Sequence, residues 1–216
     1  SEERFRGIFE TNPIGIAIVD TSDQRFLEAN AAFLDIVGYS MEELHAMTVR
    51  DVTHPEDWPD EERKIHHRLK SQTRNFSIEK RYLRKGGDVR WVRISGDLLK
   101  LDPDEPPLAI ANVEDVTERR QTERALTEFF EQASVFLSIV SQDGLFLRVN
   151  PELARTLGYT VEELLHRPSL DFVHPEDRVR VEGETSTFLG SDAESFSHSF
   201  RIVRFDGSVR VILDRG

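Results

Sequence analysis

An internal repeat constrains this chain more than any other feature of its sequence. Asn30 recurs as Asn150, and His-Pro-Glu-Asp at 54–57 recurs at 174–177, both 120 positions later. Between residues 30–57 and 150–177, 11 of 28 aligned positions are identical, against about two expected at average residue usage. Nearer the N-terminus the offset is 121, as in Phe9 and Phe130. We therefore expect two copies of one domain of about 110 residues.

Each copy has the pattern of an α+β domain, which is clearest in the first. Alternating apolar residues and flanking turns predict strands at residues 14–19, 25–29, 76–84, 89–100 and 108–113. Capping residues and helical spacing predict helices at 31–37, 41–47 and 54–70. The order β-β-α-α-α-β-β-β indicates an antiparallel sheet with its helices on one face.

Two further helices are expected outside these cores. Residues 115–132 contain no Gly or Pro and predict a connecting helix. Its partial stripe of Leu126, Phe130 and Ala133 leaves open a coiled-coil contact or a solvated connector. Phe5, Ile8 and Phe9 indicate an amphipathic N-terminal helix. The predicted divisions are an N-terminal helix at 1–11, a first domain at 12–115, a linker helix at 116–132 and a second domain at 133–216.

Composition and motifs exclude several classes of function. A net charge of −12 argues against general nucleic-acid binding. The absence of Cys excludes disulfides, thiolate nucleophiles and Cys-ligated metals. We find no phosphate-binding loop and no acid–base constellation, so we predict no catalytic or metal residues. The apolar run at 14–19 is far shorter than the ~20 residues of a membrane helix, and no signal peptide is present, so a cytoplasmic protein is expected.

Several motifs, in order and twice, resemble the PAS family of sensory domains. In the first copy they are residues 9–16, 30–33, 38–44, 54–57, 84–92 and 114–120. The last is similar to the family's Asp-Ile-Thr junction between a PAS core and its output helix. The resemblance implies two PAS domains, each a five-stranded antiparallel sheet with short helices on one face, joined by a linker helix. It also implies a sensory part of a prokaryotic signalling protein, with a histidine kinase or a cyclic-dinucleotide enzyme as output outside this chain.

The second copy departs from this pattern at its end. Gly216 is the counterpart of Gly96, so the sequence holds no counterpart of residues 97–115, which include the last strand. In PAS sheets that strand lies in the middle, and leaving its neighbours unpaired is costly. We expect an incomplete second sheet, in a chain that is a fragment.

The resemblance further implies a small cavity between each sheet and its helices. Strand alternation and helical spacing assign its wall in the first copy to Ile16, Ile18, Phe33, Ile36, Leu44, Val52, Ile65, Leu69, Phe76, Ile78, Val92 and Ile94. The second copy offers Leu137, Ile139, Leu153, Leu157, Leu164, Phe172, Phe196 and His198. Two interpretations stay open: a cavity that holds a small organic ligand, and a filled core in a pure interaction module. His198 is the polar candidate for orienting a ligand, although a histidine satisfied by a neighbour explains it as well.

The family's known cofactors are not expected here. The photoactive flavin branch requires a Cys, and non-covalent flavin has no specific support. Haem-binding members use a His on the third helix, where His66 and His67 lie, but we interpret that pair as facing solvent. His54 and His174 precede Pro at helix starts, where capping explains them better than metal binding.

The resemblance also predicts specific contacts at the junction motif of residues 114–120. The resemblance places Glu79 and Arg81 near the junction motif, which includes Thr117, and implies an Arg81–Asp115 charge pair that couples sheet to helix. The alternative is an exposed pair worth about 0–1 kcal/mol. Trp91 is expected on the outer sheet face, where the N-terminal helix or a second subunit would cover it, and this predicts a homodimer.

Overall fold

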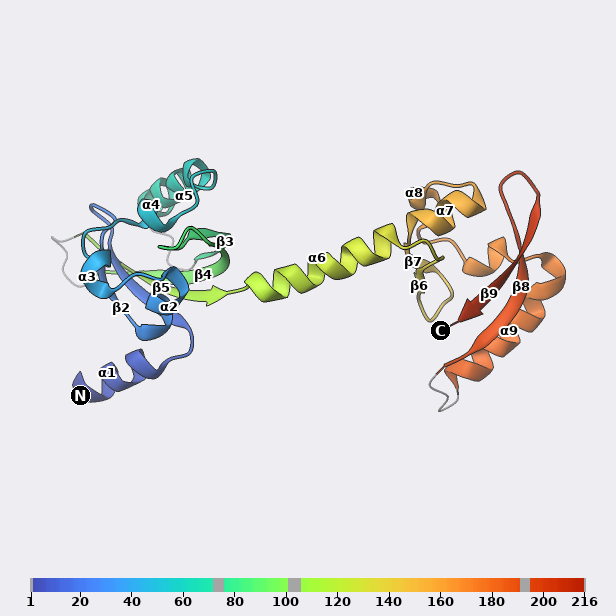
Figure 1. Ribbon diagram of the computed structural model, residues 1–216, viewed down its shortest axis with the longest axis horizontal. Coiled ribbons are helices and arrows are strands. Elements are labelled where there is room, and N and C mark those ends of the chain that lie inside the picture. Colours follow the sequence, from blue (N-terminus) through green and yellow to red (C-terminus); the bar gives the residue numbers. More distant parts are fainter. Residues whose placement is uncertain (1, 72–75, 101–105, 191–194, 216) are drawn as a thin grey trace. The chain divides into compact units, whose positions relative to one another are not determined.

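The structure is a computed structural model that describes residues 2–71, 76–100, 106–190 and 195–215 (Figure 1). It divides into two compact units, Ser1–Thr122 and Glu123–Gly216, which we call the first and second units. None of the helices in these ranges has the length and hydrophobicity that crossing a lipid bilayer requires.

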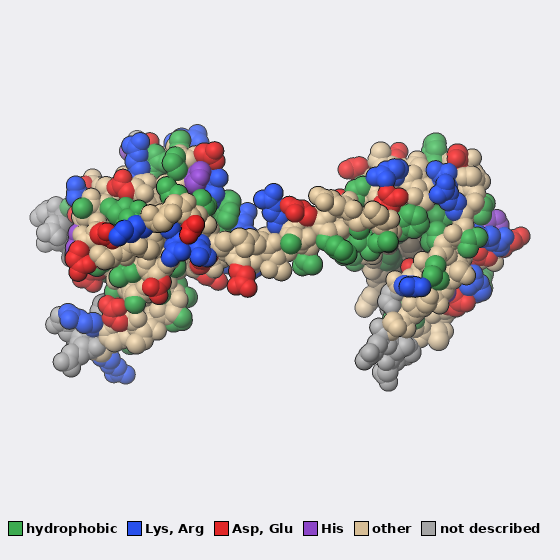
Figure 2. All heavy atoms as spheres, viewed as in Figure 1, with side chains coloured by type: hydrophobic (Ala, Val, Ile, Leu, Met, Phe, Trp, Pro, Cys, Tyr) green, Lys and Arg blue, Asp and Glu red, His purple; other side chains and the backbone are tan. Residues whose placement is uncertain are grey.

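The first unit contains the predicted five-stranded sheet. Its elements are α1 (Glu2–Thr11), β1 (Gly15–Asp20), β2 (Phe26–Ala29), α2 (Ala31–Val37), α3 (Met41–Leu44), α4 (Val49–Val52), α5 (Trp58–Ser71), β3 (Phe76–Leu83), β4 (Val89–Leu99), β5 (Leu108–Asp115) and the start of α6 (Thr117–Gln132). The strands are antiparallel in the order β2-β1-β5-β4-β3. Acidic and basic side chains are interspersed over the visible face of this unit (Figure 2).

Short-range capping explains the small helices. Ser40 and Glu43 form the predicted capping box of α3, and Thr160 and Glu163 repeat it in the second unit. Helix α4 was not predicted from the sequence; at its start Oδ2 of Asp51 accepts from the amide of Thr48 at 2.7 Å. Each such box satisfies amide groups that a helix start leaves unbonded.

The register of β1 corrects one prediction. Ala17 and Val19 are buried, whereas Ile16 and Ile18 are only half-buried on the alternate face. Helix α2 packs directly on this strand: a Cβ added to Gly15 would lie 3.1 Å from the Cα of Phe33. The small residues therefore face the helices, and choosing the larger residues as the inner set was wrong.

The second unit has the same order of elements with a different sheet. It contains β6 (Ser138–Val140), β7 (Phe146–Val149), α7 (Pro151–Leu157), α8 (Val161–Leu164), a 3-10 helix (Ser169–Phe172), α9 (Pro175–Leu189), β8 (Ser197–Val203) and β9 (Val209–Arg215). Its described strands form two separate pairs, β6-β7 and β8-β9. The five strands that the resemblance implies for a complete domain are therefore not formed by the described residues of this unit, in agreement with the expected incomplete second sheet. In the first unit β5 pairs with both β1 and β4, and the sequence holds no counterpart of it here.

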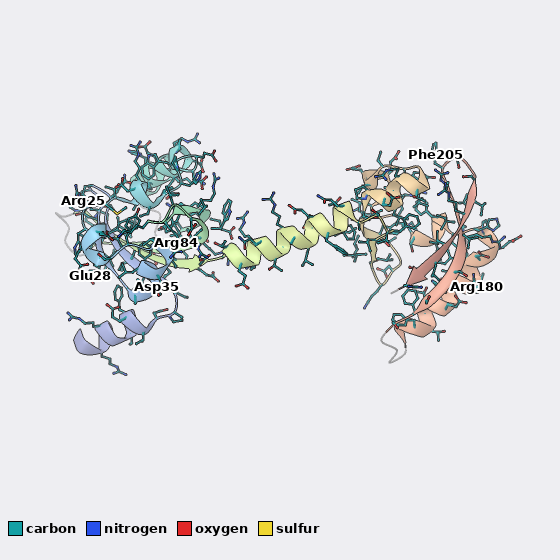
Figure 3. The ribbon with its side chains drawn as sticks, viewed as in Figure 1. Arg25, Glu28, Asp35, Arg84, Arg180 and Phe205 are labelled. Atoms are coloured by element: carbon teal, nitrogen blue, oxygen red, sulfur yellow. The ribbon has the colours of Figure 1, made fainter. Side chains whose placement is uncertain are left out.

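In both units the turn of the long hairpin, β3-β4 or β8-β9, is hydrogen-bonded to the helix that follows the short first hairpin, α2 or α7. In the first unit, Nη2 of Arg84 donates to the carbonyl oxygen of Asp35 at 3.1 Å (Figure 3). In the second, the amide of Phe205 donates to the carbonyl oxygen of Leu157 at 2.8 Å. These contacts hold the hairpin and the helix together around each core.

Candidate functional site

A cavity of about 90 Å³ lies on the inner face of the first unit's sheet. It exists because Ala17, Ala111 and Gly96 stand opposite one another on β1, β5 and β4. A Cβ on Gly96 would lie 2.2 Å from the carbonyl oxygen of Ile110, so only glycine fits there. The lining residues are Ala17, Val19, Thr21, Gln24, Phe26, Val49, Glu61, Ile65, Phe76, Lys80, Tyr82, Ile94, Leu98, Ala109 and Ala111.

The wall carries a buried ion pair that sequence reasoning missed. Lys80 on β3 and Glu61 on α5 are 5% and 6% exposed, and Nζ lies 3.6 Å from Oε1. Nζ also donates to Oγ1 of Thr53 at 3.1 Å and lies 5.4 Å from the ring centre of Tyr82. Burial, reinforced by the charge of Glu61, raises the pKa of Tyr82. The cavity thus combines an apolar lining with one charged pair.

The repeat contains a signal for this pair. At the offset of 120, Thr53, Glu61 and Lys80 correspond to Val173, Val181 and Phe200. All three polar positions of the first copy are therefore apolar in the second. An alignment of the two copies shows these three changes from polar to apolar residues. It could therefore have singled out Lys80 and Glu61 from the sequence alone.

The predicted wall of the first copy falls into three groups. Ile65, Phe76 and Ile94 line the cavity. The adjoining core contains Phe33, Leu44, Val52 and Val92, with Ile36 and Ile78 packed against it. Ile16 and Ile18 point to the other face of the sheet, and the side chain of Leu69 lies outside the described residues.

The predicted wall of the second copy is mostly core. Leu153, Leu157, Leu164 and Phe172 are buried together. Leu137 and Phe196 are half-buried, whereas Ile139 is 47% exposed. Ile139 is the counterpart of Ile18, and it is exposed together with the other two residues of its short strand, Ser138 and Val140.

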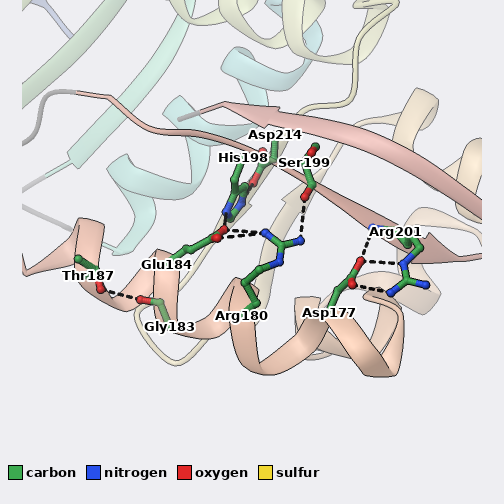
Figure 4. Close-up of polar contacts among 9 residues, drawn as sticks. All are labelled: Asp177, Arg180, Gly183, Glu184, Thr187, His198, Ser199, Arg201 and Asp214. Carbon is green, nitrogen blue, oxygen red and sulfur yellow. Dashed lines mark hydrogen bonds and ion pairs between the residues drawn. The ribbon is translucent and has the colours of Figure 1, made fainter.

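His198 is bonded on both ring nitrogens (Figure 4). Nδ1 lies 2.8 Å from Oε2 of Glu184, and Nε2 lies 3.3 Å from Oδ2 of Asp214. The rings of Phe196 and Phe200 meet the imidazole edge-on, each with its centre 5.2 Å away. A hydrogen bond from Arg180, followed by one from His198, lowers the pKa of Glu184. His198 is therefore satisfied by its neighbours.

The other four histidines considered as possible ligands are explained by exposure or by local hydrogen bonds. His66 and His67 are exposed, as expected of a solvent-facing pair. Nδ1 of His54 accepts from the amide of Glu56 at 3.3 Å, and His174 makes the same contact at its own helix start. In the described part of the chain, no three His, Asp or Glu side chains are grouped to hold a metal ion.

Trp91 on β4 joins the sheet to α6. Its amide donates to Oγ1 of Thr117 at 2.9 Å, and its carbonyl oxygen accepts from the amide of Val116 at 2.9 Å. The guanidinium of Arg120 lies 3.9 Å from the Trp91 ring centre and donates to Oε2 of Glu79 at 2.6 Å. The guanidinium of Arg120 on α6 therefore covers one face of the Trp91 ring.

The predicted Arg81–Asp115 pair is wrong. Arg81 binds Asp57 and Glu56, with Nη2 distances of 2.5 and 2.9 Å. Asp115 instead accepts from the amide of Thr117 at 2.9 Å and lies 3.4 Å from Arg90. The physical reason is the sheet order, because β4 lies between β3 and β5 and separates their residues by roughly 9–10 Å.

Comparison with known proteins adds a family and a fold. The family model described as the PAS fold matches residues 26–113 and 146–216. The probable diguanylate cyclase DgcE of Escherichia coli is 33% identical over 135 residues, which is 62% of this chain and 12% of that protein. The sensor histidine kinase TmoS of Ectopseudomonas mendocina is 30% identical over 132 residues, or 61% of this chain and 14% of that protein.

A solved structure gives the same fold. The crystal structure of a PAS domain from Colwellia psychrerythraea aligns with a TM-score of 0.50 and 19% identity, over 55% of this chain and 98% of that chain. The present chain is thus similar to a whole domain of this kind, but it spans only 12% and 14% of the two curated relatives.

Proposed function

The chain belongs to the PAS fold family, and from this premise we propose that it is the sensory part of a signal-transduction protein, built as two PAS domains in tandem. The domains would occupy residues 12–115 and 133–216, with α6 as the linker. The matched segments in both units support this division. The effector would be a histidine kinase or a cyclic-dinucleotide enzyme, in the same polypeptide or a partner, and the location would be cytoplasmic.

The contact of Trp91 with α6 carries this proposal. Thr117 and Val116 bond the Trp91 backbone, and Arg120 covers its ring. Because Trp91 and the cavity residue Ile94 share strand β4, a small shift of that strand at the cavity would reach the start of α6. The stimulus would be a small organic ligand in the first unit, and it acts only if its affinity differs between two arrangements of this strand.

The proposal includes a homodimer in which the two copies meet through α6. Leu126 and Phe129 are 64% and 68% exposed and lie one turn apart on this helix, where hydrophobic side chains are visible in Figure 2. Light scattering at increasing concentration would detect the dimer, and Leu126→Glu would weaken it. A monomer at every concentration would oppose this part of the proposal. The alternative function, an interaction module with filled cores, would keep the dimer and bind no ligand.

The test of signalling compares two arginines of α6. Arg120→Gln removes the contacts with Glu79 and Trp91, whereas Arg124→Gln removes only a pair with Glu128 of the same helix. In the full-length protein, the first variant should change output activity and the second should not. Hydrogen exchange at the start of α6 should rise in Arg120→Gln alone. Equal output and equal exchange in both variants would contradict the proposal.

A further inference from the structure

An arginine of the second unit contacts the last turn of α6. Arg148 lies on β7, opposite Ile139 of β6, and its guanidinium is 4.2 Å from the ring centre of Phe130 on α6. Nη2 of Arg148 also lies 3.6 Å from Oε1 of Glu131, the next residue of the helix. A cation over an aromatic ring and an ion pair therefore join β7 to the end of α6, and Figure 1 shows these two elements. We call this set of interactions the Arg148 contact.

The two ends of α6 make the same kind of contact with the roles exchanged. At its start, Arg120 of the helix covers Trp91 and binds Glu79, which both belong to the first unit's sheet. At its end, the helix supplies the aromatic ring and the carboxylate, and Arg148 of the strand supplies the cation. Because α6 is one continuous helix over Thr117–Gln132, each unit holds one end of it through an arginine, an aromatic ring and a glutamate.

The repeat shows that the Arg148 contact is not a general feature of this domain. At the offset of 120, the counterpart of Arg148 is Glu28. At the offset of 121, the counterpart of Glu131 is Glu10. The first copy thus has two acidic residues where the second has an ion pair, and Oε2 of Glu10 instead accepts from the amide of Ala31 at 3.3 Å. The ion pair is therefore specific to the helix that connects the two copies.

Arg148 also lies close to the residue that organises the start of the second unit. Asn150, two positions further on, is fully buried and caps α7, because its Oδ1 accepts from the amide of Leu153 at 3.1 Å. Its Nδ2 donates to the carbonyl oxygen of Val135 at 2.8 Å, shortly after α6 ends. A shift of β7 that follows α6 through Arg148 would therefore reach the cap of α7.

We propose that Arg148 is the positioning residue through which the second unit follows movements of α6. The inference rests on the proposed sensory function and adds to it the contact that receives the signal. The side chains of Arg148 and Glu131 are 45% and 46% exposed, so salt screens their attraction and the pair adds little to stability. Loss of the pair should therefore affect the coupling between α6 and β7 more than the stability of the unit.

The first experiment measures hydrogen exchange in the 216-residue chain. Arg148→Glu installs the residue of the first copy beside Glu131, and amide exchange at residues 129–133 should become about threefold faster. Arg155→Glu makes the same change of charge beside Glu152 on α7 and should leave these amides unchanged. Arg148→Glu combined with Glu131→Arg restores opposite charges and should slow the exchange again. Equal exchange in Arg148→Glu and the parent chain would overturn the Arg148 contact.

A folding control accompanies this comparison. Circular dichroism melts check that Arg148→Glu is folded. Arg148→Gln removes the cation without placing a second carboxylate beside Glu131, so it should accelerate exchange in the same direction and by less. Faster exchange throughout the second unit in both variants would mean that Arg148 only stabilises the fold, and would overturn its positioning role.

The second experiment measures output in the full-length protein. The effect of Arg120→Gln on output should be lost when Arg148→Glu is also present, and it should persist in combination with Arg155→Glu. A purely structural role for Arg148 would instead give independent, additive effects. Additive effects would overturn the role of Arg148 and leave the sensory function standing. An Arg120→Gln variant without effect in any of these backgrounds would overturn the sensory function itself, and the role of Arg148 with it.

Discussion

The carboxylate of Asp57 binds both the backbone amide and the guanidinium of Arg81. The amide of Arg81 donates to Oδ2 at 2.8 Å, and Nη2 of the guanidinium donates to Oδ1 at 2.5 Å. Asp177 repeats this arrangement with Arg201, at 2.8 and 2.7 Å. In each unit the carboxylate links the start of a long helix to the first strand of the long hairpin. The repeated His-Pro-Glu-Asp motif is thus a device that joins helix to sheet.

Removing this carboxylate's charge should destabilise the first unit. Asp57→Asn leaves a poorer acceptor for Arg81, and we expect a loss of about 1–2 kcal/mol in the free energy of unfolding. Urea denaturation followed by circular dichroism measures it. Asp60→Asn, which changes an exposed helical ion pair, should cost less. An equal loss in both variants would mean that the link between helix and strand contributes nothing specific.

The Asp57–Arg81 and Asp177–Arg201 pairs predict that the protein loses stability in acid. Hydrogen bonds from Arg81 and Arg201 hold the pKa values of Asp57 and Asp177 below their usual range. A carboxylate with a lowered folded-state pKa stabilises the protein above its unfolded pKa of about 3.9, and this stabilisation is lost as the pH falls through the folded-state pKa. Thermal melts should therefore show decreasing stability below about pH 4. The double variant Asp57→Asn, Asp177→Asn should depend less on pH in this range, and an unchanged slope would argue against these two groups.

Asn30 should be among the least replaceable residues of the first unit. It is fully buried, and its Oδ1 accepts from the amides of Ile16 and Phe33 at 2.7 and 3.0 Å. Its Nδ2 donates to the carbonyl oxygen of Phe9 at 2.9 Å. Asn30→Ala leaves these buried groups without partners, and we expect a loss of about 2–4 kcal/mol in denaturant unfolding. Stability within ~0.5 kcal/mol of the parent would contradict the role assigned to this side chain.

Gly96 and Gly86 form a matched pair of substitutions. A Cβ on Gly96 would collide with the carbonyl oxygen of Ile110, whereas one on Gly86 would meet only Oδ2 of Asp88 at 4.0 Å. We expect Gly96→Ala to cost about 1–3 kcal/mol, because strands β4 and β5 must move apart. Gly86→Ala should be nearly neutral. Calorimetric melting temperatures compare the two, and similar values would show that the sheet adapts without strain.

Much of the first unit was predictable because its signals are local. The caps at Asn30 and Ser40 place α2 and α3, and alternation places β3 and β4 close to their observed bounds. Alternation did not reveal which face of β1 is buried, since that depends on how closely α2 approaches Gly15. The junction was misassigned for a similar reason. The family resemblance implied a charge pair between Arg81 and Asp115, but β4 lies between their strands.

The sequence by itself determined the duplication, the family resemblance, the capped helices and the long hairpins, because each depends on residues near one another or on a fixed offset. Only the tertiary structure decided that Lys80 meets Glu61 across a cavity, that Arg81 meets Asp57, and that Arg120 covers Trp91. Such contacts join elements distant in the chain, and their partners follow from strand order and helix packing. Local preferences do not contain that information, since a charged side chain has the same propensities whichever partner the fold brings to it.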